Sequence, residues 1–296
     1  MKYSILGTNG FLSNAIAKFC NEKGYQLDMY GLDKPIHHTY THFYPLDIMQ
    51  GDIDVEELCK SEIIIYVVGA GIQSNLNESA DLIYALNVNA PVRICNALKQ
   101  ANYKGVFVTF GSYFELGEAD LHRPATEEDV ITASAPAPTD YVVSKRMLTR
   151  FVMSYQHDYK HWHFVLPTIY GPGENPHRLI PYTINAIKNN EELHFTSGDQ
   201  VRHYLYVGDV AEVLDTAYSK SLPSGIYNIA GHETMSVQEI VSTIHKSFKK
   251  PIAKGCFGEV QRLDTSMKYL VLDGKSMHDA IQWKSNTLLS DVIEKY

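Results

Sequence analysis

Two residues that could carry out acid–base chemistry together, Tyr141 and Lys145, stand four positions apart in "YVVSK". On a helix, residues at this spacing project from one face. A cationic lysine beside a phenol favours the tyrosinate and lowers its pKa, so the tyrosine can exchange a proton with a hydroxyl while a hydride moves. Two solvent-facing neighbours on a surface helix would show the same pattern, so the interpretation depends on the rest of the chain.

A third polar group for the same site is Ser112, at the end of the apolar segment "GVFVTFGS" (105–112). Ligands of open parallel sheets bind at the carboxyl ends of the strands. We therefore predict that Ser112 hydrogen-bonds the same substrate oxygen as Tyr141, and that Ser112, Tyr141 and Lys145 are the catalytic residues.

The glycine turn "GTNGFLS" (7–13) follows a predicted strand and opens a predicted helix. Gly7 permits a tight turn, and Gly10 lets the backbone approach a pyrophosphate at the helix N-terminus. The spacing is GxxGxxS, with Ser13 where a third glycine could pack helix on strand, and a glycine turn is also ordinary strand–helix geometry. As the first turn of an alternating pattern, it predicts dinucleotide binding.

The identity of the dinucleotide depends on Gly31, which lies 24 residues after the first glycine, where a NAD-type site offers an acid to the ribose. A missing acid removes repulsion toward a 2′-phosphate, so we expect NADP in preference to NAD. A strand offset of two residues would restore an acid at Asp33 and favour NAD. Three candidate cations follow, namely Lys34, His37 and His38.

Asp47 in "LDI" (46–48) suits the end of a third strand, facing the adenine amino group. A helix N-cap is the alternative, and Asp47 could serve as both.

The elements that position these residues alternate along the first two-thirds of the chain. Strands are predicted at 2–7, 26–31, 63–70, 105–112 and 163–171, with helices at 13–24 and 80–101 among them. This alternation predicts an α/β fold, a Rossmann-like doubly wound parallel sheet, because helices then cover both faces. We expect a smaller interleaved C-terminal substrate-binding lobe. The expected division is 1–170 with about 203–230 for the NAD(P)-binding domain, and 171–202 with 231–296 for the lobe.

Bulk properties narrow the function class. The 296 residues carry a net charge of −8, which argues against a nucleic-acid partner. No segment approaches the ~18 apolar residues of a membrane span, so no membrane partner is expected. The four cysteines are far apart and without metal-ligand spacing, which predicts reduced thiols, a cytoplasmic protein and no metal site.

Motifs along nearly the whole chain resemble those of the extended short-chain dehydrogenase/reductases, of the NAD-dependent epimerase/dehydratase type that acts on nucleotide sugars. In chain order they are "GTNGFL", "LDI", "YALNVNAPVRICNAL", "FGSYFELG", "YVVSK", "LPTIYGPG", "VRHYLYVGDVAEV", "GIYNIAG" and "AIQWKSNTLLSDVIEKY". The resemblance implies that Tyr141 is the acid/base, Lys145 its activator and ribose anchor, and Ser112 the hydroxyl partner.

The resemblance also implies the remaining site residues. For the substrate they are Arg202 on the diphosphate, Thr168 in place of a common Asn, and Tyr206, although a rim arginine is more often solvated and a strand aromatic more often in the core. The cofactor-binding set is Gly7, Asn9, Gly10, Phe11, Leu12, Gly31, Asp47, Ile48, Val68, Gly69, Asn87, Tyr141, Lys145 and Pro167.

Departures from the family pattern bear on the reaction. Leu116 replaces a usual Tyr and Val165 a common Arg, which suggests a divergent subgroup. The 4,6-dehydratases have adjacent acids after the serine, whereas this chain has Tyr113 and Phe114, with Glu115 one place later. Without paired acids, elimination lacks its proton-transfer groups.

Three functions remain open. The first is a 4-ketoreductase of an NDP-4-keto-6-deoxyhexose in surface polysaccharide sugar biosynthesis. The second is a 4-epimerase that retains its NAD, and the third a non-catalytic dinucleotide-sensing protein. The resemblance implies a homodimer through the helices containing "LIYALNVNAPVRICNAL" and "MLTRFVMSY", although their apolar residues equally permit packing on the sheet.

Overall fold

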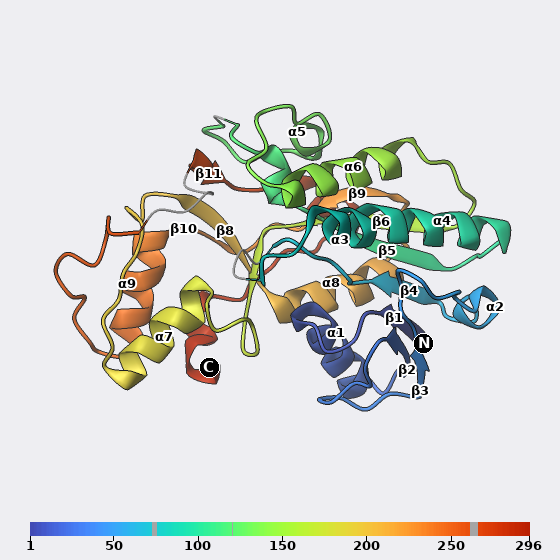
Figure 1. Cartoon of the computed structure of the whole chain (residues 1–296), viewed down its shortest axis with the longest axis horizontal. Helices are drawn as coiled ribbons and strands as arrows, with labels where there is room; N and C mark the ends of the chain where they lie inside the picture. The colour runs from blue at the N-terminus through green and yellow to red at the C-terminus, as the bar shows by residue number, and fades with distance from the viewer. Residues whose placement is uncertain (73–75, 120, 261–265) are drawn as a thin grey trace.

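The computed structural model describes residues 1–72, 76–119, 121–260 and 266–296 (Figure 1). Its centre is a seven-stranded sheet of order β3-β2-β1-β4-β5-β6-β9, in which all neighbouring strands are parallel. This confirms the predicted Rossmann-like sheet. The strands are β1 (Lys2–Leu6), β2 (Gln26–Gly31), β3 (His42–Pro45), β4 (Ile63–Tyr66), β5 (Val106–Ser112), β6 (Lys160–Leu166) and β9 (Gly225–Asn228).

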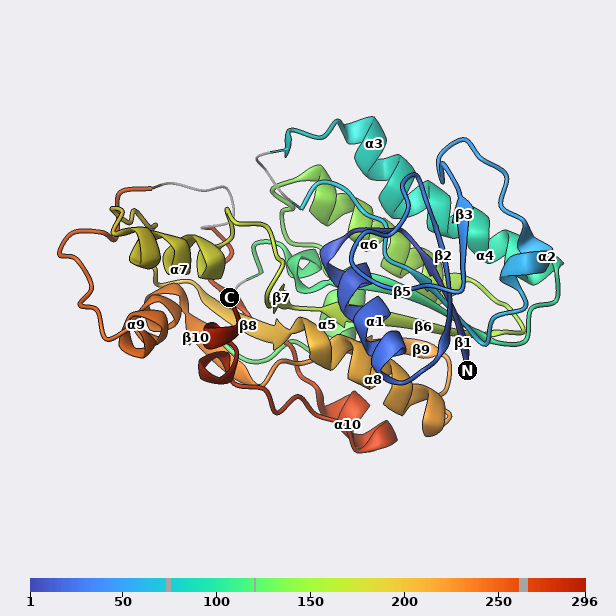
Figure 2. The same cartoon turned by 90° about the horizontal axis from the view of Figure 1, so that it is seen from below.

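Helices cover both faces of this sheet (Figures 1 and 2). On one face lie α1 (Phe11–Glu22) and α8 (Val207–Ser219), and on the other α4 (Ala90–Gln100) and α6 (Asp140–Ser154). Successive strand residues face opposite sides, so Ile5 and Ile65 join one core cluster and Leu6 and Ile64 the other. Burial on both faces explains the nearly continuous apolar runs of the central strands.

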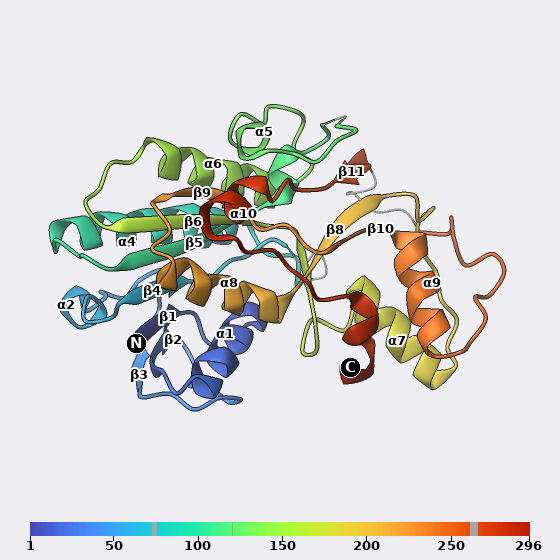
Figure 3. The same cartoon turned by 180° about the vertical axis from the view of Figure 1, so that it is seen from behind.

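A smaller lobe is built on a second sheet, in which β8 (Val201–Tyr206) pairs with β7 (Thr168–Tyr170), β10 (Glu233–Ser236) and β11 (Tyr269–Leu270). Its own core contains residues of α7 (Leu179–Asn189) and α9 (Val237–Ser247). The chain passes back to the main sheet at β9 and α10 (Lys275–Ile281) before ending in the small lobe (Figure 3). We keep the division into two domains as a proposal; a boundary at 202/203 would cut through β8.

Several shorter elements complete the described fold. They are α2 (Val55–Leu58), α3 (Ala80–Tyr84), the π-helical η2 (Ala85–Asn89), the 3-10 helix η3 (Tyr113–Leu116), α5 (Glu127–Ile131), η5 (Leu289–Asp291) and η6 (Ile293–Lys295).

Three predicted elements differ in the structure. The segment 163–171 is not one strand: β6 ends at Leu166, and after Pro167 the chain enters the second sheet as β7. Proline has no N–H to donate to a central strand, which accounts for the break. The helix predicted at 80–101 contains the π-turn η2 between α3 and α4. Strand β4 ends at Tyr66, so the predicted residues 67–70 form a loop.

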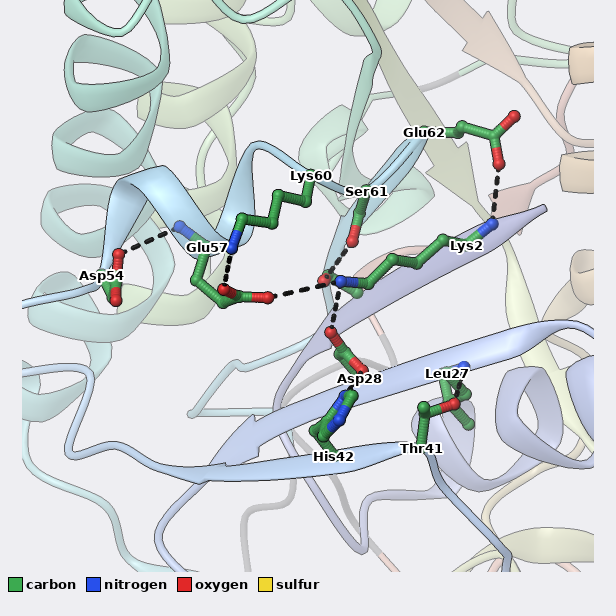
Figure 4. Close-up of polar contacts among 11 residues, drawn as sticks. Lys2, Leu27, Asp28, Thr41, His42, Asp54, Glu57, Lys60, Ser61 and Glu62 are labelled. Atoms are coloured by element: carbon green, nitrogen blue, oxygen red, sulfur yellow. Dashed lines mark hydrogen bonds and ion pairs between the residues drawn. The ribbon is translucent and has the colours of Figure 1, made fainter.

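Asp28, the nearest acid before Gly31 in the sequence, has a structural role. Asp28 is fully buried in β2, with Lys2 Nζ 2.8 Å from one carboxylate oxygen and His42 Nδ1 3.0 Å from the other (Figure 4). A buried carboxylate needs such partners to offset its lost hydration. Asp28 is therefore committed to holding β1, β2 and β3 together.

Candidate active site

The glycine turn joins β1 to α1. Gly7 has φ +114, and a Cβ there would lie 2.9 Å from Val68 Cγ2, so the turn requires glycine. Gly10 is the N-cap of α1 and has no side chain to occupy the helix's first amide groups. Phe11 and Leu12 open the helix, and its first turn has no acidic residue. A helix end of this kind attracts an anion, so the cradle fits a dinucleotide pyrophosphate.

Side chains of the turn hold the loop that follows β2. Asn9, at φ +59, donates from Nδ2 to Lys34 O at 3.0 Å and accepts from Ile36 N at 3.0 Å. Thr8 donates to Asp33 O at 2.8 Å, and a Cβ on Gly31 would lie 2.6 Å from the Thr8 hydroxyl. The close contact with Thr8 thus requires glycine at position 31. The same glycine leaves this position without an acid for the ribose.

The basic residues of that loop differ in their electrostatic state. Lys34 is exposed, whereas burial and the nearby His37 and Lys18 lower the pKa of His38. This makes His38 a weaker candidate for a cation than Lys34.

Asp47 lies just beyond β3, and its Oδ1 accepts from Met49 N at 3.0 Å. The Asp47 side chain thus caps a turn by accepting from the backbone N–H two residues later in the chain. The alternative of a helix N-cap is wrong, because α2 begins at Val55 with Asp54 as its cap. The adjacent Ile48 is buried, and its carbonyl accepts from the Arg93 guanidinium.

Asn87 connects three parts of the site. Its amide accepts from Ala70 N at 3.0 Å, donates to Ala70 O at 2.9 Å and donates to Ser144 Oγ at 2.9 Å. It therefore fixes the loop after β4, where a Cβ on Gly69 would lie 3.2 Å from Asn87 Oδ1. Ser144 belongs to α6, between Tyr141 and Lys145. The π-turn directs the Asn87 side chain to this junction.

The three predicted catalytic residues lie together in the structure. The Ser112 side chain acts to lower the pKa of Tyr141, and Lys145 Nζ is 5.7 Å from the centre of the Tyr141 ring. Lys145 is buried and donates to Phe110 O at 2.9 Å. Ser112 caps η3 in a capping box, in which its N–H donates to Glu115 Oε1 at 2.7 Å. Helix α6 and the end of β5 thus hold all three.

Burial dominates the electrostatics of this group. It raises the pKa of Tyr141 to about 12, against the lowering effect of the Ser112 side chain. It lowers the pKa of Lys145 to about 8, against the raising effect of Glu115. The expected lowering of the tyrosine pKa is therefore not found, because desolvation outweighs it. Tyr141 is a protonated phenol at neutral pH.

The two residues directly after Ser112 carry no carboxylate into the site. Tyr113 is buried, with its hydroxyl 2.5 Å from the Thr168 hydroxyl, and the Phe114 ring lies edge-on to Tyr141 at 6.5 Å. Glu115 is fully buried, and burial raises its pKa to about 7.

The predicted substrate residues lie on the segments leading into the small lobe. Pro167 is buried between β6 and β7, and Thr168 on β7 pairs in register with Tyr204. Arg202 is buried in β8 rather than solvated, and its charge lowers the pKa of Tyr204. Tyr206 packs 6.0 Å from the ring of Tyr170, with Lys295 over it at 5.7 Å, as a lobe aromatic would.

Arg178 is a site residue that the sequence analysis missed. Burial raises the pKa of both Tyr141 and Tyr204, and the charge of Arg178 acts to lower both, so its charge reaches the catalytic tyrosine. Its Nε is 3.1 Å from Glu174 Oε2. The signal was its place at the end of "GPGENPHR", immediately before α7.

Among the described residues, no group of three or more His, Cys, Asp or Glu side chains is arranged to hold a metal ion. Within the same ranges, none of the helices is both long enough and apolar enough to cross a lipid bilayer.

Comparisons with known proteins identify the family of this chain. The model of the NAD dependent epimerase/dehydratase family matches residues 3–230. Human dTDP-D-glucose 4,6-dehydratase is 30% identical over 136 residues, which are 44% of this chain and 39% of that enzyme. CDP-abequose synthase of Salmonella muenchen is 27% identical over 190 residues, 62% of this chain and 57% of the synthase. The matches thus span about two-fifths to three-fifths of these relatives.

Among solved structures, MoeE5 in complex with UDP-glucuronic acid and NAD superposes with a TM-score of 0.82. The superposition covers 99% of this chain and 97% of MoeE5 at 19% identity. At that identity the likeness establishes the fold.

Proposed function

The chain belongs to the NAD-dependent epimerase/dehydratase family, and from its site we propose that it is an NAD(P)-dependent 4-ketoreductase of a nucleotide-linked 4-keto-6-deoxyhexose. The observation that carries the proposal is that Tyr113 and Phe114 occupy the dehydratase acid positions beside Ser112 and Tyr141. Elimination requires paired acid–base groups that these two side chains cannot supply.

The protonation state of Tyr141 favours reduction as the starting direction. A ketone that becomes an alcohol takes a proton at its oxygen, and burial raises the pKa of Tyr141 to about 12, so the phenol holds a proton at neutral pH. An epimerase begins by removing the proton of a hydroxyl, for which a tyrosinate is needed. The NAD-retaining epimerase is therefore the second candidate function. A non-catalytic dinucleotide-sensing protein is the third, because Ser112, Tyr141 and Lys145 are all present.

In the proposed reaction, each residue of this chain has a separate task. Ser112 and Tyr141 hydrogen-bond the carbonyl oxygen, and Tyr141 gives its phenolic proton to that oxygen as the alcohol forms. Lys145 stabilises the phenolate left behind. A reduced nicotinamide, when bound, supplies the hydride. Phe114 lies against the edge of Tyr141 and excludes water from it.

The cofactor would lie with its pyrophosphate on the turn at Gly7 and Gly10. We keep NADP as the preferred dinucleotide because position 31 offers no acid and exposed Lys34 lies in the adjoining loop. The solved structure of MoeE5 is a complex with NAD, so both dinucleotides belong in the assay.

For the substrate, we propose that Arg178 and Arg202 attract the nucleotide diphosphate, with Thr168 and Tyr206 nearer the sugar. The charges of both arginines act on Tyr204, which supports a common location. Arginine suits this task because its fork matches phosphate oxygens.

We propose a homodimer through the outer face of α6, where Val143, Met147 and Met153 are 36%, 48% and 57% exposed. Exposed apolar side chains gathered on one helix are typical of an interface. The four cysteines are free thiols, and we propose a cytoplasmic location on that ground.

The test is to incubate the purified protein with NADPH or NADH and a panel of dTDP-, UDP-, GDP- and CDP-linked 4-keto-6-deoxyhexoses. The proposal expects one substrate to be reduced with one reduced cofactor consumed per sugar. Interconversion of sugar epimers on tightly bound NAD, with no net consumption, would instead establish the epimerase.

A further inference from the structure

Glu174 is a buried acid in the loop between β7 and α7, and the proposed reaction gives it no role. Its side chain is 2% exposed. One carboxylate oxygen, Oε1, accepts from the Gly171 backbone N–H at 3.3 Å and from the Tyr296 hydroxyl. The other oxygen, Oε2, forms an ion pair with Arg178, whose Nε is 3.1 Å away. Both oxygens of the carboxylate are therefore partnered, by groups from three parts of the chain.

The loop that contains Glu174 and Arg178 is folded by its own backbone. Glu174 N donates to Gly171 O at 3.2 Å, and Arg178 N donates to Asn175 O at 2.9 Å. The loop also packs closely on a predicted substrate residue, because a Cβ on Gly171 would lie 3.1 Å from the Tyr206 ring. The ion pair is therefore part of a compact turn at the entry to the small lobe.

The segment of η5 and η6 holds the Tyr296 hydroxyl against this loop, beside α7 (Figure 3). Tyr296 packs against the core cluster of the small lobe, to which its own segment contributes Leu289, Val292 and Ile293. The tyrosine is thus fixed by the lobe core, and through its hydroxyl it fixes Glu174.

The electrostatics of the ion pair are those of a buried anion and a partly open cation. Burial raises the pKa of Glu174, and the charge of Arg178 acts against this rise, together with the hydrogen bonds from Tyr296 and Gly171. A buried carboxylate is costly unless such partners are present. The Arg178 side chain is 29% exposed, and its charge reaches Tyr141. Arg178 is therefore held on one side and accessible to a ligand on another.

Resting on the proposed function, we propose that Glu174 is a positioning residue that fixes the Arg178 guanidinium for the diphosphate of the nucleotide sugar. Pairing at Nε leaves the two terminal nitrogens of the fork, with their N–H donors, for phosphate oxygens. An arginine without this partner would lose the freedom of a long side chain when the ligand binds, which weakens binding. Glu174 removes that cost before the ligand arrives.

A different role for the same ion pair predicts the opposite result. If Glu174 only offset the charge of Arg178, removing its negative charge would strengthen the attraction of a diphosphate. If Glu174 positions Arg178, removing the carboxylate weakens binding in spite of the lost negative charge. The direction of the change in affinity therefore separates the two roles.

The test is calorimetry with dTDP, UDP, GDP and CDP, of which the tightest ligand is then used with the variants. Glu174→Gln and Arg178→Ala should each weaken binding at least about tenfold, and the double variant should bind no more weakly than Arg178→Ala. Glu192→Gln, at a position 94% exposed in the small lobe, is the control for one lost negative charge and should bind normally. The affinity for NADP should be the same in all variants. Unchanged or tighter diphosphate binding by Glu174→Gln, losses that add in the double variant, or an equal loss of NADP affinity would overturn the proposal.

If Glu174→Gln does not fold, Tyr296→Phe replaces it, because this variant keeps the carboxylate and removes one group that holds it. Its diphosphate binding should weaken at least about threefold. Tyr218→Phe, which loses a hydroxyl on Glu62 at 3.2 Å, is the matched control and should bind normally. Equal affinity of Tyr296→Phe and the unmodified protein would count against the proposal.

The inference and the proposed function fail in different ways. A protein that binds a diphosphate but reduces no sugar of the panel lacks the proposed function, and calorimetry still decides the role of Glu174. A protein that reduces a sugar while Glu174→Gln binds diphosphate normally overturns the inference alone. Binding of none of the four diphosphates by the unmodified protein also overturns the inference, and the sugar panel then decides the function.

Discussion

The buried carboxyl group of Glu115 gives a prediction about stability that is independent of any substrate. Glu115→Gln keeps an acceptor for the Ser112 N–H but removes the titrating proton. Burial raises the pKa of Glu115 from 4.5 to about 7. Because the folded pKa exceeds the unfolded one, folding is favoured by protonation of Glu115: the contribution of this carboxyl group to stability is largest below about pH 4.5 and is lost as the pH rises to about 7.

The size of the effect follows from the same pKa change. At about 1.4 kcal/mol for each tenfold change in proton affinity, the change from 4.5 to about 7 corresponds to about 3 kcal/mol. The free energy of unfolding of Glu115→Gln, relative to the unmodified protein, should therefore rise by about 3 kcal/mol between about pH 4.5 and pH 7.5. Lys145 titrates above this range, with a pKa of about 8, which sets its upper limit.

Urea unfolding followed by circular dichroism at several pH values measures this difference directly. Glu128→Gln, at an exposed position of α5, controls for the loss of one negative charge. A difference between Glu115→Gln and the unmodified protein that stays constant within about 0.5 kcal/mol across the range would refute the reasoning, because Glu115 would then be ionised in the fold without cost.

Three further predictions concern the site. Tyr141→Phe should lower kcat by about 10²–10⁴-fold with little change in cofactor affinity, measured by NADPH oxidation and by cofactor titration. Asn87→Ala should cost about 2–4 kcal/mol in urea unfolding, because it removes three buried hydrogen bonds, and should also lower kcat. Gly31→Ala should weaken binding of NADP and NAD alike, seen by calorimetry, because its Cβ would lie 2.6 Å from the Thr8 hydroxyl and displace the turn; weakening of NADP alone would contradict this steric account.

Much of the fold could be predicted from the sequence because the strands are short, apolar and separated by helical patterns. The break at Pro167 was missed, since the apolar run continues across it into a different sheet. The π-turn around Asn87 was also missed, because it arises from contacts with the loop after β4 and with Ser144 rather than from local pattern.

The site shows the same contrast. The juxtaposition of Ser112 with Tyr141 was predictable from local patterns: Ser112 stands at the end of a strand, and Tyr141 stands four residues before Lys145 on a helix. The pairing of His161 and His163 with Thr109 could not be predicted, because it depends on the register between β5 and β6. Glu115 stood in a readable Ser-x-x-Glu capping box, but its burial and raised pKa come from tertiary packing.

The fate of the hydride tests the central claim most directly. The measurement follows deuteride from stereospecifically labelled NADPH or NADH into the sugar product, by mass spectrometry, together with the amount of oxidised cofactor released. We predict one deuterium at carbon 4 of the sugar for each cofactor oxidised, and loss of both signals in Tyr141→Phe. Epimerised sugar without net cofactor oxidation, or an unchanged rate in Tyr141→Phe, would contradict the account.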